Sequence, residues 1–246
     1  MQRYFTNKLV DDYFILNDDD LYHINKVMRM KENDKVEVVF KNNVYSGIIT
    51  SNGIKKDELL SEEVTLKNIT LIIPLLKETK MDLILQKATE LGVSRIIPVR
   101  MERSIIKLNE QDYLKKQIRW QKICKEASEQ SKRTNIPLID KLESMSSLNL
   151  DGLNIICSTS ENSNTLKNTL KNMDKYDKIN IAIGPEGGFT KEEEKILVSL
   201  GFIKTSLGKL IMRVETVPLY ILSVINYLEL EEWLYVPGFK RISESH

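Results

Sequence analysis

Two glycine-bearing segments in the second half of the chain hold residue types that can bind a ligand. The first, Gly184-Pro-Glu-Gly-Gly188, follows the apolar run 179–183 and precedes Thr190. Thr190 and Glu193 have capping-box spacing, which predicts a helix that begins there. Glycine lets a ligand approach the backbone closely, and open α/β sheets bind ligands beyond the carboxyl ends of their strands. The segment predicts a ligand-binding loop, with a glycine-rich turn that binds nothing as the alternative.

The residue types in this loop narrow the choice of ligand. Its spacing fits neither the dinucleotide-binding motif nor the P-loop, since Phe189 follows Gly188 where the P-loop needs lysine. Glu186 inside the loop would repel a phosphate group. A nucleoside-like ligand without phosphates fits these residues better, and a nucleotide-hydrolysing enzyme is disfavoured.

The second segment, residues 205–218, is another connection from a strand to a helix. It contains Gly208, and Arg213 and Glu215 lie two positions apart. At the same sheet edge it would form the other wall of the ligand crevice. The alternative is an ordinary connection whose Arg and Glu form a surface ion pair, which contributes little to stability.

Residues 112–133 predict a basic helix with seven Lys/Arg against three Asp/Glu. Helical spacing places four residues toward the core: Tyr113, Trp120, Cys124 and Ala127. The opposite face is expected to hold Lys115, Arg119, Lys122, Glu126, Glu129 and Arg133. Such a face is either solvated or contacts nucleic-acid phosphates. Four residues of the N-terminal region could extend the same surface: Arg3, Lys26, Arg29 and Lys31.

Composition limits the classes of protein. The formal net charge of +1 excludes a highly charged disordered chain and a uniformly basic nucleic-acid coat. No apolar run approaches the length of a membrane span, and the N-terminus lacks the apolar core of a signal peptide, so a cytoplasmic protein is expected. Cys124, Cys157, His23 and His246 are too scattered for a zinc site, so no metal is expected.

Residues 1–68 have the pattern of a small β-rich, barrel-like domain. Residues 35–40 alternate apolar and polar side chains, and residues 44–50 form the return strand of a hairpin that turns at Asn42-Asn43. A helix is expected from Asp18, with Leu21, Ile24, Val27 and Met28 at helical spacing.

From residue 69 the pattern alternates between strands and helices. The predicted strands are 69–75, 94–99, 153–157, 179–183 and 202–207. The predicted helices lie at 81–91, 109–132, from 190, and at 218–230. This alternation predicts an α/β fold with a mainly parallel sheet. We therefore expect two domains, residues 1–68 and residues 69–246.

Several ordered motifs resemble those of a known family. They include Arg3-Tyr-Phe5, residues 23–30, Gln86-Lys-Ala-Thr-Glu-Leu-Gly-Val93, Glu102-Arg-Ser104, Ile183-Gly-Pro-Glu-Gly-Gly-Phe189, and Leu207-Gly208 with Arg213-Val-Glu-Thr216. The chain resembles the bacterial 16S ribosomal RNA uridine-N3 methyltransferases, the RsmE family of the SPOUT superfamily. The match covers nearly the whole chain.

The resemblance implies a PUA-like N-terminal barrel that grips RNA and a C-terminal domain with a deep trefoil knot. It also implies S-adenosylmethionine as methyl donor, a homodimer, and 16S ribosomal RNA of the small ribosomal subunit as substrate. By analogy the donor is held by residues 157–160, 184–188 and 207–216. The corresponding donor-binding candidates are Thr159, Gly184, Glu186, Gly188, Leu207, Gly208, Ile211 and Met212.

Three residues are candidates for the chemistry of methyl transfer. Arg213 could stabilise negative charge that develops on the uracil oxygens. Glu215 could orient Arg213 or accept the N3 proton. Arg103, which the other subunit could supply, could contact a phosphate or a base. Two alternatives remain: methylation of a ribose 2′-oxygen, and a non-catalytic protein that binds ribosomal RNA during assembly.

Overall fold

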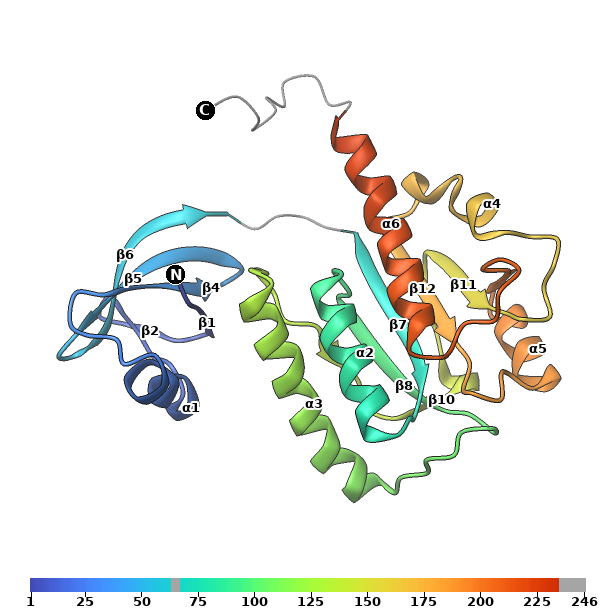
Figure 1. Cartoon of the computed structure of the whole chain (residues 1–246), viewed down its shortest axis with the longest axis horizontal. Coiled ribbons are helices and arrows are strands. Elements are labelled where there is room, and N and C mark those ends of the chain that lie inside the picture. Colours follow the sequence, from blue (N-terminus) through green and yellow to red (C-terminus); the bar gives the residue numbers. More distant parts are fainter. Residues whose placement is uncertain (63–66, 235–246) are drawn as a thin grey trace. The chain divides into compact units, whose positions relative to one another are not determined.

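The computed structural model describes residues 1–62 and 67–234 and divides the chain into two compact units (Figure 1). The first unit is Met1–Leu66 with Ile118–Leu138, and the second is Lys67–Gln117 with Ile139–His246. Contacts thus group residues 118–138 with the N-terminal part of the chain. The predicted boundary after residue 68 would place them in the C-terminal domain instead. The boundary of the functional domains stays a prediction.

The first unit is built on a six-stranded sheet with the order β1-β4-β5-β6-β3-β2. Its strands are β1 (Arg3–Thr6), β2 (Leu9–Val10), β3 (Tyr13–Phe14), β4 (Lys35–Phe40), β5 (Asn43–Thr50) and β6 (Gly53–Ser61). β1 pairs with β4 in parallel, and the other pairs are antiparallel. The buried core holds Tyr4, Phe14, Leu16, Ile24, Val36, Val38 and Ile54.

The predicted hairpin between β4 and β5 is confirmed, but its turn lies one residue earlier than expected. Lys41 and Asn42 are the central residues, with φ angles of 50° and 62°. Two consecutive left-handed residues are the signature of the hairpin turn that matches the twist of its strands.

The predicted first helix begins at Asp18 and is capped by the side chain of Asn17. It forms α1 (Asp18–Tyr22) and continues as a π-helical segment η1 (His23–Val27). Ile24 is buried, but Leu21, Val27 and Met28 are exposed, so the predicted apolar stripe is wrong for those three. The change to π-helical winding alters the angular spacing on which a 3.6-residue stripe depends.

The second unit contains the predicted parallel sheet. Its strands are β7 (Asn68–Pro74), β8 (Arg95–Arg100), β9 (Leu138–Ile139), β10 (Glu143–Ser144), β11 (Leu153–Cys157), β12 (Lys178–Ile183) and β13 (Ile203–Thr205). The order is β10-β8-β7-β12-β11-β13, with β9 also paired to β8. All pairs along that order are parallel. The sequence did not predict β9 and β10, because two-residue strands carry no periodicity.

The strand order of the sheet reverses between the neighbouring strands β7 and β12. From β7 the chain adds β8 and β10 on one side, and β12, β11 and β13 on the other. Such a reversal leaves a crevice outside the carboxyl ends of the two central strands, where open α/β sheets bind their ligands. The glycine loop that follows β12 lies at this point of the sheet.

Helices cover the sheet of the second unit. They are α2 (Glu78–Glu90), α4 (Leu166–Leu170), α5 (Lys191–Ser199) and α6 (Thr216–Leu234), with short turns η2 (Met145–Ser147) and η3 (Met173–Lys175). Helix α3 (Glu110–Gln130) begins in the second unit, and its residues from Ile118 onward belong to the first. α2 and α6 pack side by side (Figure 1), where the Asn226 amide donates to the Leu91 carbonyl oxygen at 3.0 Å. Leu197 of α5 belongs to a core cluster with Ile72, Ile97 and Ile156.

The basic helix α3 buries the predicted residues Tyr113, Trp120, Cys124 and Ala127. Its predicted charged face is confirmed for Lys115, Arg119, Lys122 and Glu126, which are exposed. The prediction of an exposed side chain is wrong for Glu129 and Arg133. The Glu129 side chain is 20% exposed, and Arg133 is 9% exposed. α3 ends at Gln130 and Lys132 has a φ of 61°, so helical spacing does not extend to Arg133.

Among the described residues, no helix combines the length and the apolar character that crossing a bilayer requires.

Candidate functional site

A cavity of about 1270 Å³ opens at the carboxyl ends of the central strands of the second unit. Its walls come from segments that follow β8, β11, β12 and β13, together with the first turn of α2 and one face of α5. Ligand pockets commonly measure about 300–1,000 Å³. This volume leaves room for a nucleoside-sized ligand and part of a second molecule.

The glycine loop forms the floor of the cavity, and two of its glycines have a clear structural reason. A Cβ atom on Gly184 would lie 3.0 Å from the ring and the backbone nitrogen of Phe189. Gly188 has a φ of +70°, and no atom lies within 4 Å of where its Cβ would be. The first glycine permits the tight turn, and the second leaves open space beside the backbone.

The helix that follows the loop begins where the sequence predicts. Thr190 and Glu193 form both hydrogen bonds of the capping box. A carboxylate oxygen of Glu193 also accepts a hydrogen bond from the backbone nitrogen of Glu102 at 2.7 Å. The capped end of α5 thus fixes the segment after β8 against the glycine loop.

Arg103 lies against this loop. Its Nη1 atom donates to the carbonyl oxygens of Gly187 at 2.8 Å and of Phe189 at 3.1 Å. A Cβ on Gly187 would come within 3.3 Å of the Arg103 side chain. Arg103 therefore lines the cavity of its own chain, and the expected supply of this arginine by the other subunit stays a prediction.

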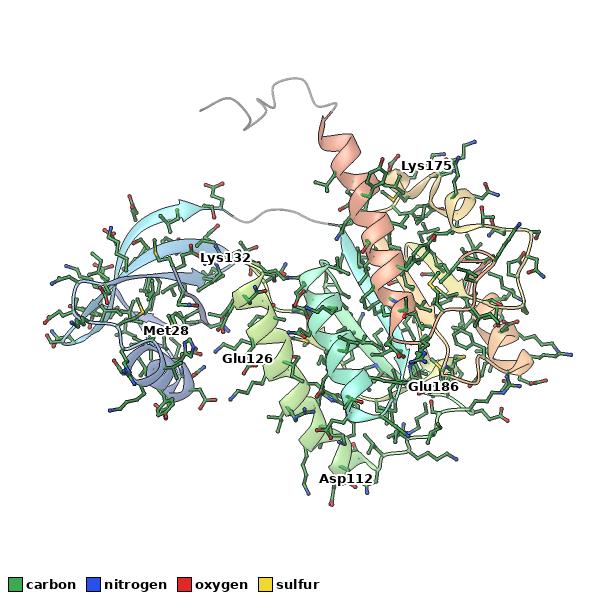
Figure 2. All side chains as sticks on the ribbon, in the orientation of Figure 1. Met28, Asp112, Glu126, Lys132, Lys175 and Glu186 are labelled. Atoms are coloured by element: carbon green, nitrogen blue, oxygen red, sulfur yellow. The ribbon has the colours of Figure 1, made fainter. Side chains whose placement is uncertain are left out.

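Lys80 joins the two predicted ligand loops, a role that the sequence did not suggest. Its ammonium nitrogen lies 3.0 Å from Oε1 of Glu186 and 3.6 Å from Oε2 of Glu215. Lys80 stands in the first turn of α2 after β7, and Glu186 follows the neighbouring strand β12. Figure 2 labels Glu186 at the end of the sheet where α6 begins. The position of Lys80 shortly after a buried strand was its only signal in the sequence.

The Lys80 bridge affects the pKa of Glu186. Burial raises the pKa of Glu186, but the hydrogen bond from Lys80 and its positive charge outweigh burial, so that the pKa lies below its usual value. The same hydrogen bond raises the pKa of Lys80. Oε2 of Glu215 is buried and has no hydrogen-bond partner among the residues that the structure describes. Glu186 and Lys80 are therefore both charged at neutral pH.

The segment after β11 contributes a polar network. Oε1 of Glu194 accepts a hydrogen bond from Ser158 at 2.5 Å, and Oε2 lies 2.8 Å from the Lys204 ammonium. Burial raises the pKa of Glu194, but the hydrogen bonds and the charge of Lys204 outweigh burial. The net pKa therefore lies below its usual value, and the group stays ionised. Burial raises the pKa of the Cys157 thiol to about 12, which keeps it neutral and unreactive.

The loop of residues 207–216, called the third loop below, forms an exposed wall of the cavity. Ile211, Met212 and Arg213 line the cavity, and the side chain of Ile211 is 86% exposed. Leu207 and Gly208 lie outside the lining residues, although Gly208 has a φ of +123° with open space around it. Glu215 reaches the site only through its contact with Lys80.

The predicted donor-binding and chemical residues thus converge largely on one cavity. Those that line it are Thr159, Gly184, Glu186, Gly188, Ile211, Met212, Arg103 and Arg213. Residues 1–62 and 67–234 contain no group of three or more His, Cys, Asp and Glu side chains placed to hold a metal ion. His246, weighed above as a zinc ligand, lies outside the described residues.

The predicted RNA-binding residues fall into two groups. Lys26, Arg29, Lys115, Arg119 and Lys122 are exposed. Arg3 and Arg133 are each only 9% exposed.

Internal contacts account for the two buried arginines. Arg3 lies 2.8 Å from Glu37 and donates to the Arg133 carbonyl oxygen at 3.0 Å. The guanidinium of Arg133 donates to Oδ1 of Asn135 at 2.6 Å, and burial lowers its pKa to about 10. These arginines hold β1 and the segment after α3 together.

Comparison with known proteins gives two family matches. A family described as an RNA methyltransferase domain matches residues 62–226, and an RNA methyltransferase PUA domain matches residues 16–59. The second match confirms the predicted PUA-like N-terminal domain beside the α/β fold.

Individual relatives match over most of the chain. Ribosomal RNA small subunit methyltransferase E of Bacillus subtilis is 33% identical over 92% of this chain and 96% of its own length. The enzyme of the same name from Neisseria gonorrhoeae, bound to S-adenosyl methionine, has a TM-score of 0.78 and 28% identity over 93% of this chain and 98% of its own. A Legionella pneumophila protein in complex with SAM has a TM-score of 0.80 and 25% identity over 92% of this chain and 97% of its own. On these matches, the chain belongs to the ribosomal RNA small subunit methyltransferase E family of RNA methyltransferases.

Proposed function

We propose that this protein transfers a methyl group from S-adenosylmethionine to N3 of a uridine in 16S ribosomal RNA of the small ribosomal subunit. The observation that carries the proposal is the cavity at the reversal of strand order, where two glycine-bearing loops meet around Lys80. Family membership supports the same reaction, since relatives are named small subunit methyltransferases and one is bound to the donor.

The residues around the cavity fit a nucleoside donor without phosphates. The space beside Gly188 would be filled by any side chain at that position. Glu186 is ionised and would repel a phosphate, whereas the donor carries a sulfonium. Thr159, Gly184, Glu186, Gly188, Ile211 and Met212 would hold it, with weaker help from Leu207 and Gly208 at the rim. When bound, it supplies an electrophilic methyl group.

The acceptor must leave its base pair. N3 lies on the Watson–Crick edge of uracil, so the base has to be unpaired and turned into the pocket. The main task of the protein is then to align the acceptor nitrogen with the methyl carbon. The size of the cavity suits this arrangement, since it exceeds what one nucleoside needs.

Charged residues assist the acceptor. Arg213 faces the cavity and would stabilise negative charge on the uracil oxygens as the N3 proton leaves. Glu215 lies outside the cavity lining and 3.6 Å from the Lys80 ammonium, so we propose that it orients Arg213 or acts on the departing N3 proton through Lys80. Arg103, fixed by two carbonyl groups of its own chain, can contact a phosphate or a base.

Other parts of the proposal rest on exposed residues and on the resemblance. We propose that the RNA lies on a surface that includes Lys26, Arg29, Lys115, Arg119 and Lys122. We also propose a cytoplasmic homodimer with a knotted C-terminal domain. Large apolar side chains that are strongly exposed in the second unit support self-association: Leu210, Ile211, Tyr227 and Leu230.

The test is incubation with unmethylated small ribosomal subunits and labelled donor, followed by mass mapping and nucleoside analysis. Label in 3-methyluridine supports the proposal. Label on a ribose 2′-oxygen would indicate the alternative methylation. Donor binding without any transfer to subunits or to 16S RNA would indicate the non-catalytic alternative.

A further inference from the structure

The donor cavity carries more positive charge than its acidic side chains balance. Its charged lining residues are Lys80, Arg103, Lys191, Lys195, Lys204, Arg213, Glu186 and Glu194. Lys80 is paired with Glu186, and Lys204 is paired with Glu194. In the part of the chain that the structure describes, Lys191 and Lys195 have no acidic partner within 4 Å. Two ammonium groups at the cavity are therefore available to an anion.

The two lysines lie on one face of α5. Lys191, Glu194, Lys195, Val198 and Ser199 all line the cavity, at the spacing of successive helical turns. The opposite side of the helix carries Leu197, which is fully buried in the core. Core packing therefore fixes which face α5 presents, and both lysines are exposed on it.

The positions of these two lysines do not favour the stability of helix α5. Lys191 is the first residue of α5, at the helix end where the dipole favours negative charge. Lys191 and Lys195 also form a like-charged i,i+4 pair, which costs about 0.2–0.5 kcal/mol in an isolated helix. Two of the neighbouring glutamates are engaged elsewhere, because the Glu193 carboxylate caps the helix and Glu194 pairs with Lys204. Neither the position of Lys191 nor the spacing of the lysine pair favours the helix.

We propose that Lys191 and Lys195 bind backbone phosphates of the RNA strand on either side of the target nucleotide. This inference rests on the proposed function and names the part of the site that holds the acceptor. Ammonium groups on flexible stems bind phosphates as point charges, without selecting a base. A splayed nucleotide brings its own flanking phosphates to the mouth of the pocket, and the donor has none. The α5 face would hold that strand while the base enters the cavity.

The experiment compares wild type with Lys191→Gln/Lys195→Gln, which removes both charges and keeps a good helix former. The matched control is Lys171→Gln/Lys175→Gln. These two lysines have the same spacing, are exposed and do not line the cavity. Lys175 precedes β12 and lies at the opposite end of the sheet from Glu186 (Figure 2). Lys191→Arg/Lys195→Arg serves as the rescue variant.

Three quantities are measured for each variant: the donor Kd by calorimetry, the Kd for unmethylated small subunits at several salt concentrations, and the KM for methylation. Each lost phosphate contact lowers the salt slope by about 0.7 for a single strand, which corresponds to about tenfold in affinity for two contacts near physiological salt. The Gln double variant is expected to lose about tenfold in subunit affinity with an unchanged donor Kd. The arginine variant should restore it, and the control should match wild type.

Two outcomes would overturn the inference. Unchanged subunit affinity and salt slope would show that the α5 lysines are merely solvated. A weaker donor Kd with an unchanged salt slope would assign them to the donor carboxylate instead. Both results presuppose that wild type binds donor and methylates subunits, so failure of wild type in these assays would count against the proposed function itself.

Discussion

The ammonium nitrogen of Lys80 lies 3.0 Å from Oε1 of Glu186, across an interval of 106 residues. This contact joins the first turn of α2 to the glycine loop after β12. Lys80 also lies 3.6 Å from Oε2 of Glu215, which belongs to the loop of residues 207–216. One cation thus stands between carboxylates of two loops that would otherwise repel each other. The shape of the donor cavity depends on this arrangement.

Lys80→Met should lower methylation more than it lowers stability. The ion pair is partly exposed, so its loss should lower the unfolding free energy only slightly. Without the cation, Glu186 and Glu215 repel each other and the two loops separate, which should reduce kcat by about tenfold or more. Steady-state kinetics and thermal unfolding measure the two effects. Lys87→Met is the matched control, since Lys87 is paired on the same helix and does not line the cavity. Equal losses in both variants would argue against the bridge.

Arg213→Ala should separate donor binding from chemistry. Arg213 lines the cavity but is exposed and forms no part of the glycine loop. Loss of a group that stabilises developing charge typically costs about 10²–10³ in kcat. We expect that loss with a donor Kd close to wild type by calorimetry. Lys209→Ala, an exposed residue on the same segment outside the cavity, is the control. Unchanged turnover of Arg213→Ala would reject the assigned role.

Glu129 should make the first unit less stable as the pH rises. Burial is the main cause that raises its pKa to about 7, against the attraction of Lys125. The unfolded chain releases this proton near pH 4.5, whereas the folded chain retains it to about 7, so stability falls across that window.

Glu129→Gln should remove this loss. Its unfolding free energy should exceed that of wild type progressively from pH 4.5 to 7, in denaturant titrations followed by tryptophan fluorescence. Glu126→Gln, an exposed neighbour on α3, should show no such trend. A constant difference across the pH range would show that Glu129 is not buried as described.

Arg3→Met distinguishes a structural arginine from an RNA-binding one. Arg3 is 9% exposed and binds Glu37 together with the carbonyl oxygens of Lys132 and Arg133. Without Arg3, Glu37 keeps Lys132 as a partner at 2.9 Å, but two carbonyl oxygens lose their donor, which should cost about 1–3 kcal/mol. Thermal unfolding should therefore show a lower Tm, whereas exposed Lys8→Met should not. A stable Arg3→Met variant with weakened RNA binding would instead support the role expected from the sequence.

The sequence by itself determined the local elements of this protein. Alternation over 35–40 gave the hairpin, apolar runs gave the parallel strands, and Thr190 with Glu193 fixed the start of α5, because each signal acts between residues a few positions apart. The sequence did not predict the two-residue strands, the π-helical turn after Tyr22 or the burial of Arg133. A change of helical winding or a reversal of the chain interrupts the periodicity on which such predictions depend. Residue types and the family resemblance also predict that the two glycine-bearing loops bind a ligand.

Only the tertiary structure decided which of these residues meet. The strand order places β7 beside β12, and that neighbourhood alone puts Lys80 against Glu186. The same packing turns one face of α5, with Lys191 and Lys195, toward the cavity. Contacts between residues so far apart along the chain depend on how strands are ordered in the sheet, and no local pattern of side chains specifies that order.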